Sequence, residues 1–228
     1  MIISDTHQFL YIKTRKTAGT SIQTALGSCC GADDYIAGNS ALHQNSWNRW
    51  WEYPIARAQS AMLGRNFWPH ARKYSKHATI SDVMSVIGGT CQESYLKIAF
   101  IRNPFDLVVS RFFWDGYKQR HDHSSFTSWV EQDYCQDDQW RADLLHSYTH
   151  INNVCHIDFI GRYENLNQDY HKLCELLGFS SYPGLSFQKA GFRPNGHYST
   201  FYTPQSRAII ERLFSDDLRL FDYRFESL

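Results

Sequence analysis

The sequence has no excess of charge of either sign, no paired-cysteine spacing and no long apolar run, and each absence excludes a class of protein. Lysine plus arginine and aspartate plus glutamate balance at 23 each, which argues against a broadly basic nucleic-acid surface. Six cysteines occur without a CxxC pair, so free buried thiols are expected rather than a disulfide framework. The apolar start of the chain is too short and too polar for a signal peptide or a membrane span. We therefore expect a cytoplasmic protein with no nucleic-acid and no membrane partner.

The histidines lack the companions that a metal site needs. His121 and His123 form an HxH pair, and His146 and His150 lie one helical turn apart, but no cysteine or carboxylate cluster completes either set. No metal ion is expected. With 228 residues, 43% of them hydrophobic and 20% charged, the chain fits one globular domain over residues 1–228.

Buried strands alternate with helices along the chain. Apolar runs predict strands over 9–14, 95–102 and 156–163, and periodic segments predict helices over 21–27, 78–89, from 104 onward, over 164–179 and over 203–223. Thr79 and Asp82 fit a capping box, and Gly178 fits a helix end. The alternation predicts an α/β fold of the P-loop-like, three-layer kind, with a central parallel sheet flanked by helices. Residues 31–76, rich in tryptophan and without a clean period, are predicted to be an insertion.

The first candidate site is the segment KTAGTS, residues 16–21, which follows the first predicted strand. Small residues before a helix let backbone N–H groups converge on an anion. Lys16 adds a positive charge, and the hydroxyls add hydrogen-bond donors. The alternative is an ordinary strand-to-helix turn with a solvated lysine. Because Lys16 precedes Gly19, the segment does not fit the GxxxxGK[ST] loop of ATPases and GTPases.

The second candidate site is RNPFDLVVS, residues 102–110, at the end of the second predicted strand. Arg102 offers a bidentate fork and Ser110 a hydroxyl two helical turns later, a combination suited to a phosphomonoester. The alternative is that Arg102 pairs with Asp106 and that Ser110 lies on an ordinary helix.

Taken together, these segments resemble a known family. FLYIKTRKTAGTSIQTAL resembles the 5′-phosphosulfate loop, and IAFIRNPFDLVVSRFF the 3′-phosphate motif, of the sulfotransferase family that includes carbohydrate and heparan sulfate 2-O enzymes and many bacterial members. Segments beginning at Lys76, Asp158 and Tyr198 also resemble later blocks of that family. The family often has proline where this chain has Arg15. The resemblance covers most of the chain except about 33–74, where the acceptor site is expected.

The resemblance implies an enzyme that transfers the sulfuryl group of 3′-phosphoadenosine 5′-phosphosulfate (PAPS), without a metal, to a hydroxyl or amine of a carbohydrate or small natural product. Lys16 would stabilise the negative charge on the leaving bridging oxygen. His77 would be the base that takes the acceptor proton, with His70 and Glu164 as alternatives. The residues expected to hold the donor are Arg15, Lys16, Thr17, Ala18, Gly19, Thr20, Ser21, Arg102, Ser110 and Arg193.

Two other functions stay open on the sequence. One is a nucleotide-dependent kinase of P-loop architecture, which would need magnesium and a carboxylate near Ser21 to hold it. The other is a catalytically silent binding module that kept the fold and lost the chemistry.

Overall fold

A five-stranded sheet forms the centre of the molecule. The computed structural model describes residues 1–31, 34–37, 77–85, 94–122, 125–136, 138–186 and 191–227. Its strand order is β3-β1-β2-β4-β7, with β1 at Ile2–Ser4, β2 at Phe9–Ile12, β3 at Tyr35–Ile36, β4 at Leu96–Ile101 and β7 at Phe159–Arg162. β2, β4 and β7 are parallel, whereas β1 runs antiparallel to both of its neighbours. The predicted α/β class is confirmed, with a mostly parallel sheet in place of a fully parallel one.

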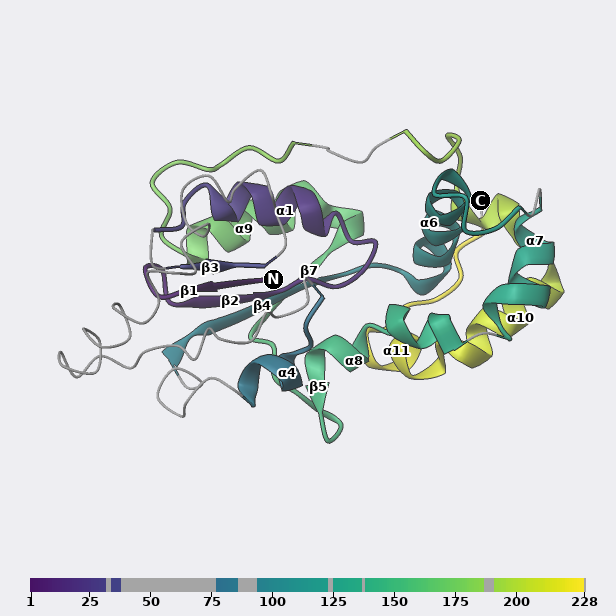
Figure 1. The fold of residues 1–228 in the computed structure, drawn as a ribbon, viewed down its shortest axis with the longest axis horizontal. Helices are drawn as coiled ribbons and strands as arrows, with labels where there is room; N and C mark the ends of the chain where they lie inside the picture. The colour runs from purple at the N-terminus through teal and green to yellow at the C-terminus, as the bar shows by residue number, and fades with distance from the viewer. Residues whose placement is uncertain are drawn as a thin grey trace.

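Helices cover both faces of the sheet, as Figure 1 shows. The longer ones are α1 (Gly19–Gly27), α6 (Pro104–Tyr117), α9 (Leu166–Leu176) and α10 (Pro204–Leu213). The shorter ones are α4 (Ile80–Met84), α7 (Phe126–Trp129), α8 (His146–Thr149) and α11 (Ser215–Leu220). A π-helical turn (Val130–Tyr134), 3₁₀ helices (Asp138–Asp143, Tyr163–Asn165 and Tyr198–Phe201) and a small hairpin, β5 (His150–Ile151) with β6 (Val154–Cys155), complete the described elements.

Strand residues alternate between two apolar cores, which explains why the strands read as continuous apolar runs. Phe9 and Tyr11 of β2 pack with α1 and α9 on one face of the sheet. Leu10 and Ile12 pack on the other face, in the core that includes residues of α4 and α8. The two cores and the sheet between them make the predicted three layers (Figure 1).

The first strand and its turn depend on a distant carboxylate. Asp34 is 1% exposed and accepts hydrogen bonds from the backbone N–H groups of Asp5 and Thr6 and from the Ser4 hydroxyl, at 2.8, 3.1 and 2.8 Å. Asp34 therefore fixes the turn between β1 and β2 from a position far along the sequence. Tyr35–Ile36 of the predicted insertion thus form a strand of the sheet, whereas its residues 32–33 and 38–76 lie outside the described part of the chain.

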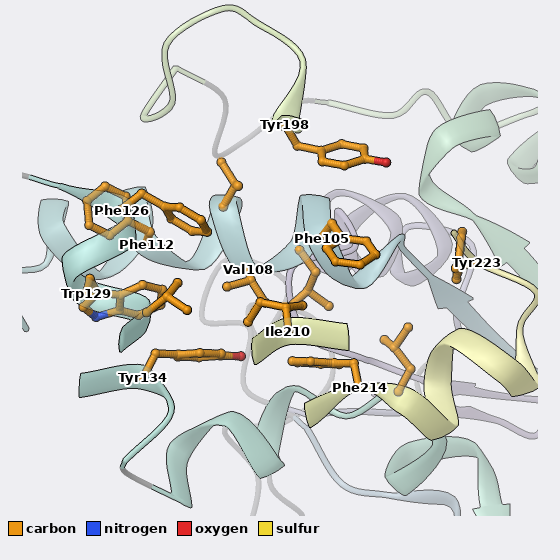
Figure 2. Packing of buried hydrophobic residues seen from close by; sticks show 14 of the residues in the cluster. Phe105, Val108, Phe112, Phe126, Trp129, Tyr134, Tyr198, Ile210, Phe214 and Tyr223 are labelled. Carbon is orange, nitrogen blue, oxygen red and sulfur yellow. The ribbon is translucent and has the colours of Figure 1, made fainter. Parts of the chain in front are cut away.

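A third apolar core joins the helices beyond the end of the sheet. Figure 2 shows Phe105, Val108 and Phe112 of α6 packed toward Trp129, Ile210 and Phe214. The helical segment predicted over 203–223 is present, and a break at Phe214 (φ −107°, ψ 20°) divides it into α10 and α11. The break leaves α11 free to bring Asp217, whose side chain is fully buried, to the start of α8.

The pairing of His146 with Asp217 predicts pH-dependent stability. Asp217 accepts from the backbone N–H and from Nδ1 of His146, at 2.8 and 2.7 Å. The hydrogen bond to Asp217, opposed by burial, raises the pKa of His146 above its ordinary value. Because the folded pKa is raised, the pair stabilises the protein fully below the unfolded pKa of about 6.5 and loses this contribution as pH rises through the folded pKa.

We expect His146→Asn, which keeps an N–H donor without the charge, to lower the free energy of unfolding more at about pH 5.5 than at about pH 8.5. Urea unfolding at the two pH values measures the difference. An equal loss at both values would contradict the assignment.

Candidate active site

The loop between β2 and α1 has the geometry of an anion-binding turn. Lys16 and Ala18 both adopt left-handed backbone conformations, with φ of 59° and 56°. Residues other than glycine rarely adopt this conformation, and it turns successive N–H groups toward one concave surface. Among the described residues no side chain caps the N-terminus of α1, and its first turn has no acidic residue. The first N–H groups of α1 are therefore available to an anion.

A second lysine, which the sequence interpretation missed, lies under this helix end. Lys13 is 7% exposed, and its Nζ donates to Gln23 Oε1 at 2.7 Å and to Thr20 Oγ1 at 3.3 Å. A Cβ at Gly19 would lie 2.8 Å from Lys13 Cγ, so only glycine leaves room for this lysine. Its signal in the sequence is a lysine at the end of an otherwise apolar strand.

Lys16 is largely buried beside other charges. Its Nζ lies 4.8 Å from the centroid of the Trp114 ring on α6. Burial, and next the positive charge of Arg102, lower the pKa of Lys16 to about 8, while Asp115 and Asp143 act in the opposite direction. The ammonium group is thus poorly solvated, and a developing negative charge next to it would be strongly stabilised.

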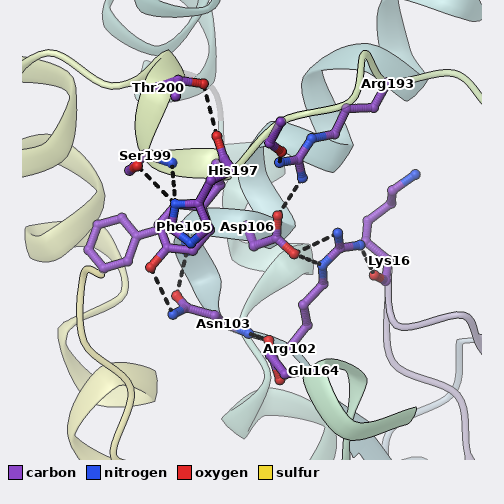
Figure 3. Close-up of polar contacts among 12 residues, drawn as sticks. Lys16, Arg102, Asn103, Phe105, Asp106, Glu164, Arg193, His197, Ser199 and Thr200 are labelled. Carbon is purple, nitrogen blue, oxygen red and sulfur yellow. Dashed lines mark hydrogen bonds and ion pairs between the residues drawn. The ribbon is translucent and has the colours of Figure 1, made fainter. Parts of the chain in front are cut away.

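Arg102 joins the two predicted motifs. Its NH1 donates to the Lys16 carbonyl at 2.8 Å, while Nε and NH2 both lie 2.7 Å from Asp106 Oδ2 (Figure 3). The guanidinium stacks 3.8 Å from the centroid of the Tyr163 ring. These contacts leave two of the five guanidinium N–H groups without a hydrogen-bond partner among the described residues.

Asp106 brings a second arginine to the same place. Arg193, from the loop before the 3₁₀ helix Tyr198–Phe201, pairs with Asp106 Oδ1 and donates to the Gly196 carbonyl at 2.8 Å (Figure 3). Although burial opposes it, the two arginines hold the pKa of Asp106 below its ordinary value. The Arg102–Asp106 pair that a purely structural interpretation expects is therefore present, within a cluster of two arginines that one carboxylate does not neutralise.

Three other residues predicted to hold the donor differ in their surroundings. Ser110 lies on α6 two turns after Arg102 and one turn after Asp106, on the same face by spacing. Thr17 is fully buried, and its hydroxyl lies 2.8 Å from that of Thr14, so it holds the loop together. Arg15 points toward Asp143, with NH1 4.0 Å from Oδ1, and its buried Nε has no hydrogen-bond partner among the described residues.

The three candidate bases differ in placement. His77 Nδ1 lies 2.9 Å from the Lys13 carbonyl, which places the imidazole beside the loop and assigns the N–H to Nδ1. Glu164 accepts from the Asn103 backbone N–H at 2.7 Å and from the Tyr223 hydroxyl at 3.0 Å, so both of its oxygens hold the fold. His70 lies outside the described residues. The identity of the base stays a prediction.

The described part of the chain has neither a metal-ligand cluster nor a membrane-spanning helix. Within the ranges given above, His, Cys, Asp and Glu side chains do not gather in a group of three that could hold a metal ion. No helix in the same ranges is both long enough and apolar enough to cross a bilayer. Of the five described cysteines, all free thiols, Cys174 is buried as expected and Cys155 is exposed, contrary to expectation.

The site lies where the carboxyl ends of β2 and β4 meet, the edge at which open α/β sheets bind phosphorylated ligands.

The model of the sulfotransferase family matches residues 1–224, so the chain belongs to the sulfotransferase family. An uncharacterized protein of Archaeoglobus fulgidus is 32% identical over 96 residues, which are 40% of this chain and 75% of that protein. No solved structure matches. The predicted family is confirmed, while the finer carbohydrate or heparan sulfate 2-O-like type stays a prediction.

Proposed function

We propose that this protein transfers the sulfuryl group of PAPS to a hydroxyl or amine of a carbohydrate or small natural product without a metal ion. The observation that carries the proposal is the hydrogen bond from Arg102 to the Lys16 carbonyl. This bond joins the loop before α1, with its uncapped helix end, to the arginine cluster at Asp106. The loop with Lys16 and the cluster with Arg102 suit the 5′-phosphosulfate and the 3′-phosphate of this donor. The cytoplasmic location expected from the sequence belongs to the same proposal.

The residues of the two motifs fit the donor chemically. The uncapped N-terminus of α1 and Lys16 suit the phosphosulfate, whose charge a poorly solvated ammonium attracts. Arg102, with two N–H groups left over, and Ser110 and Arg193 suit the 3′-phosphate. The donor supplies an activated sulfuryl group, and Arg15 to Ser21 hold it in line with the acceptor.

Lys16 and His77 would act at opposite ends of the transfer. The acceptor oxygen or nitrogen forms a bond to sulfur while the bond from sulfur to the bridging oxygen breaks, and its electron pair stays on the 5′-phosphate. Lys16 stabilises the charge that grows on that bridging oxygen. His77 Nε2 takes the acceptor proton, because Nδ1 already carries one toward the Lys13 carbonyl.

Calorimetric titration with adenosine 3′,5′-bisphosphate in EDTA tests the proposal, with ATP as the control ligand. We expect metal-free binding that is selective over ATP, because ATP lacks the 3′-phosphate for Arg102 and Ser110. Magnesium-dependent binding of ATP would favour a kinase. Failure to bind either nucleotide would favour a silent module.

The same titration on variants tests the assignment of the 3′-phosphate cluster. We expect Arg102→Ala to weaken bisphosphate binding roughly 10- to 100-fold, the usual range for loss of a charged hydrogen-bonding partner. Ser110→Ala, which removes a single hydroxyl and disturbs the fold less, should weaken it by about 10-fold or less. Arg207, paired with Glu211 on α10, offers a control substitution to alanine that should leave binding unchanged. Equal affinity in all three variants would overturn the assignment.

A further inference from the structure

The side chain of Lys16 crosses from its own loop to α6, where an aromatic ring receives the ammonium. Nζ lies 4.8 Å from the centroid of Trp114, within the distance at which a cation is attracted by the face of an indole. Trp114 in turn packs edge-on against Phe192, at 5.2 Å between centroids, in the loop that carries Arg193. The ring is therefore fixed between α6 and that loop.

Backbone and side chain of Lys16 are held by different groups. The backbone has a left-handed conformation, and Arg102 donates to its carbonyl at 2.8 Å (Figure 3). Neither contact restrains the four-carbon side chain. In the described part of the chain, the end of this side chain lies over the indole ring of Trp114, a neutral group.

The charges around Lys16 come from several elements and act on its ammonium group in opposite directions. Arg102 at the end of β4 and Arg111 on α6 disfavour the ammonium, whereas Asp115 on α6 and Asp143 favour it. Lys118, next to α6, adds a second ammonium 5.0 Å from the same indole ring. Asp115 and Asp143 are both paired with Arg111. An attraction that involves no carboxylate, such as that of the Trp114 ring, can therefore contribute to holding the Lys16 ammonium group.

An aromatic face differs from a carboxylate in one useful respect. It stabilises a cation by its quadrupole without neutralising the charge. A carboxylate in its place would form an ion pair that an arriving anion must break, and it would repel that anion. A ring keeps the cation in place, charged and attractive to a ligand.

We propose that Trp114 is a positioning residue that holds the Lys16 side chain beside the anion-binding loop in its protonated form. The inference rests on the proposed function for its purpose, namely to present a charged ammonium group to the donor. The attraction between the Trp114 ring and the Lys16 ammonium group does not itself depend on any ligand.

Competitive acetylation of the full chain tests the proposal. The rate of Lys16 acetylation is followed by peptide mass spectrometry across pH, and its midpoint gives the pKa of this one lysine. We expect Trp114→Leu to lower that pKa by about half a unit, the equivalent of a modest cation–π attraction. The Lys16 pKa in Trp114→Phe should lie between its values in the unaltered protein and in Trp114→Leu, because a benzene ring attracts cations less strongly than indole.

Tyr117→Leu is the matched control, since it removes an exposed ring from the same helix that faces Lys118 at 5.1 Å. We expect the Lys16 pKa to be unchanged in this variant. An unchanged pKa in Trp114→Leu, or an equal fall in Tyr117→Leu, would overturn the proposal.

A second arm separates this inference from the proposed function. Adenosine 3′,5′-bisphosphate added before acetylation should protect Lys16 in the unaltered protein. Absence of protection together with a lower pKa in Trp114→Leu would overturn the donor assignment alone. Protection together with no pKa change would overturn the role of Trp114 alone.

Discussion

Replacement of Lys16 by alanine is expected to lower turnover by about 100- to 1,000-fold, the range seen when a group that stabilises transition-state charge is removed. The loss should fall mainly on kcat, because Lys16 would act on charge that develops only as the bridging oxygen leaves. Affinity for PAPS should fall only modestly, because the loop N–H groups, Arg102 and Ser110 still hold it. Release of the bisphosphate from PAPS measures turnover, and calorimetry measures affinity.

Lys172 provides the control for this experiment. It is an exposed lysine on α9 that pairs with Asp169 at 3.1 Å, away from both motifs. Lys172→Ala should keep the turnover of the unaltered protein, because an exposed pair of this kind contributes little to the fold. Normal turnover in Lys16→Ala would remove the basis for the proposed mechanism.

Gly161→Ala is expected to destabilise the fold. Gly161 lies in β7 directly opposite Phe100 of β4, and Phe100 is fully buried. An added Cβ would lie 2.6 Å from both Cδ1 and Cζ of the Phe100 ring. Forcing a buried ring aside typically costs about 1–3 kcal/mol. Urea unfolding should show this loss of free energy of unfolding.

Two further variants make the interpretation specific. Gly184→Ala introduces the same methyl group where nothing lies within 4 Å, so its free energy of unfolding should change by no more than about 0.5 kcal/mol. Phe100→Leu combined with Gly161→Ala should recover part of the loss, because the smaller side chain leaves space. Similar unfolding midpoints for the two alanine variants would show that Phe100 does not restrict this position.

Features encoded by neighbouring residues were predictable from the sequence. The capping box at Thr79 and Asp82 is present, and Gly178 ends its helix segment with φ of 67°. Both strand-loop-helix units occur as predicted, although α1 begins two residues early, at Gly19. Each depends on side chains only a few positions apart, so propensity and spacing suffice to indicate it.

Features that depend on distant partners were not predictable in this way. The antiparallel β1 needs Asp34 to fix its turn, and the break at Phe214 accompanies burial of Asp217 against α8. The chain from 126 to 149, with its π-helical turn and short helices, has no clean period because it packs into a core shared by several helices. Tertiary contacts override local preference in such segments.

The sequence by itself determined the two motifs that we propose hold the donor, their order and the residue types in them, because each motif is local to one strand and the helix that follows. Only the tertiary structure decided that Arg102 would hold the Lys16 carbonyl, that Arg193 would join it at Asp106, and that Trp114 would receive the Lys16 ammonium. These contacts join residues about 90 positions apart along the chain. Their geometry exists only once parallel strands have brought their carboxyl ends to one edge of the sheet.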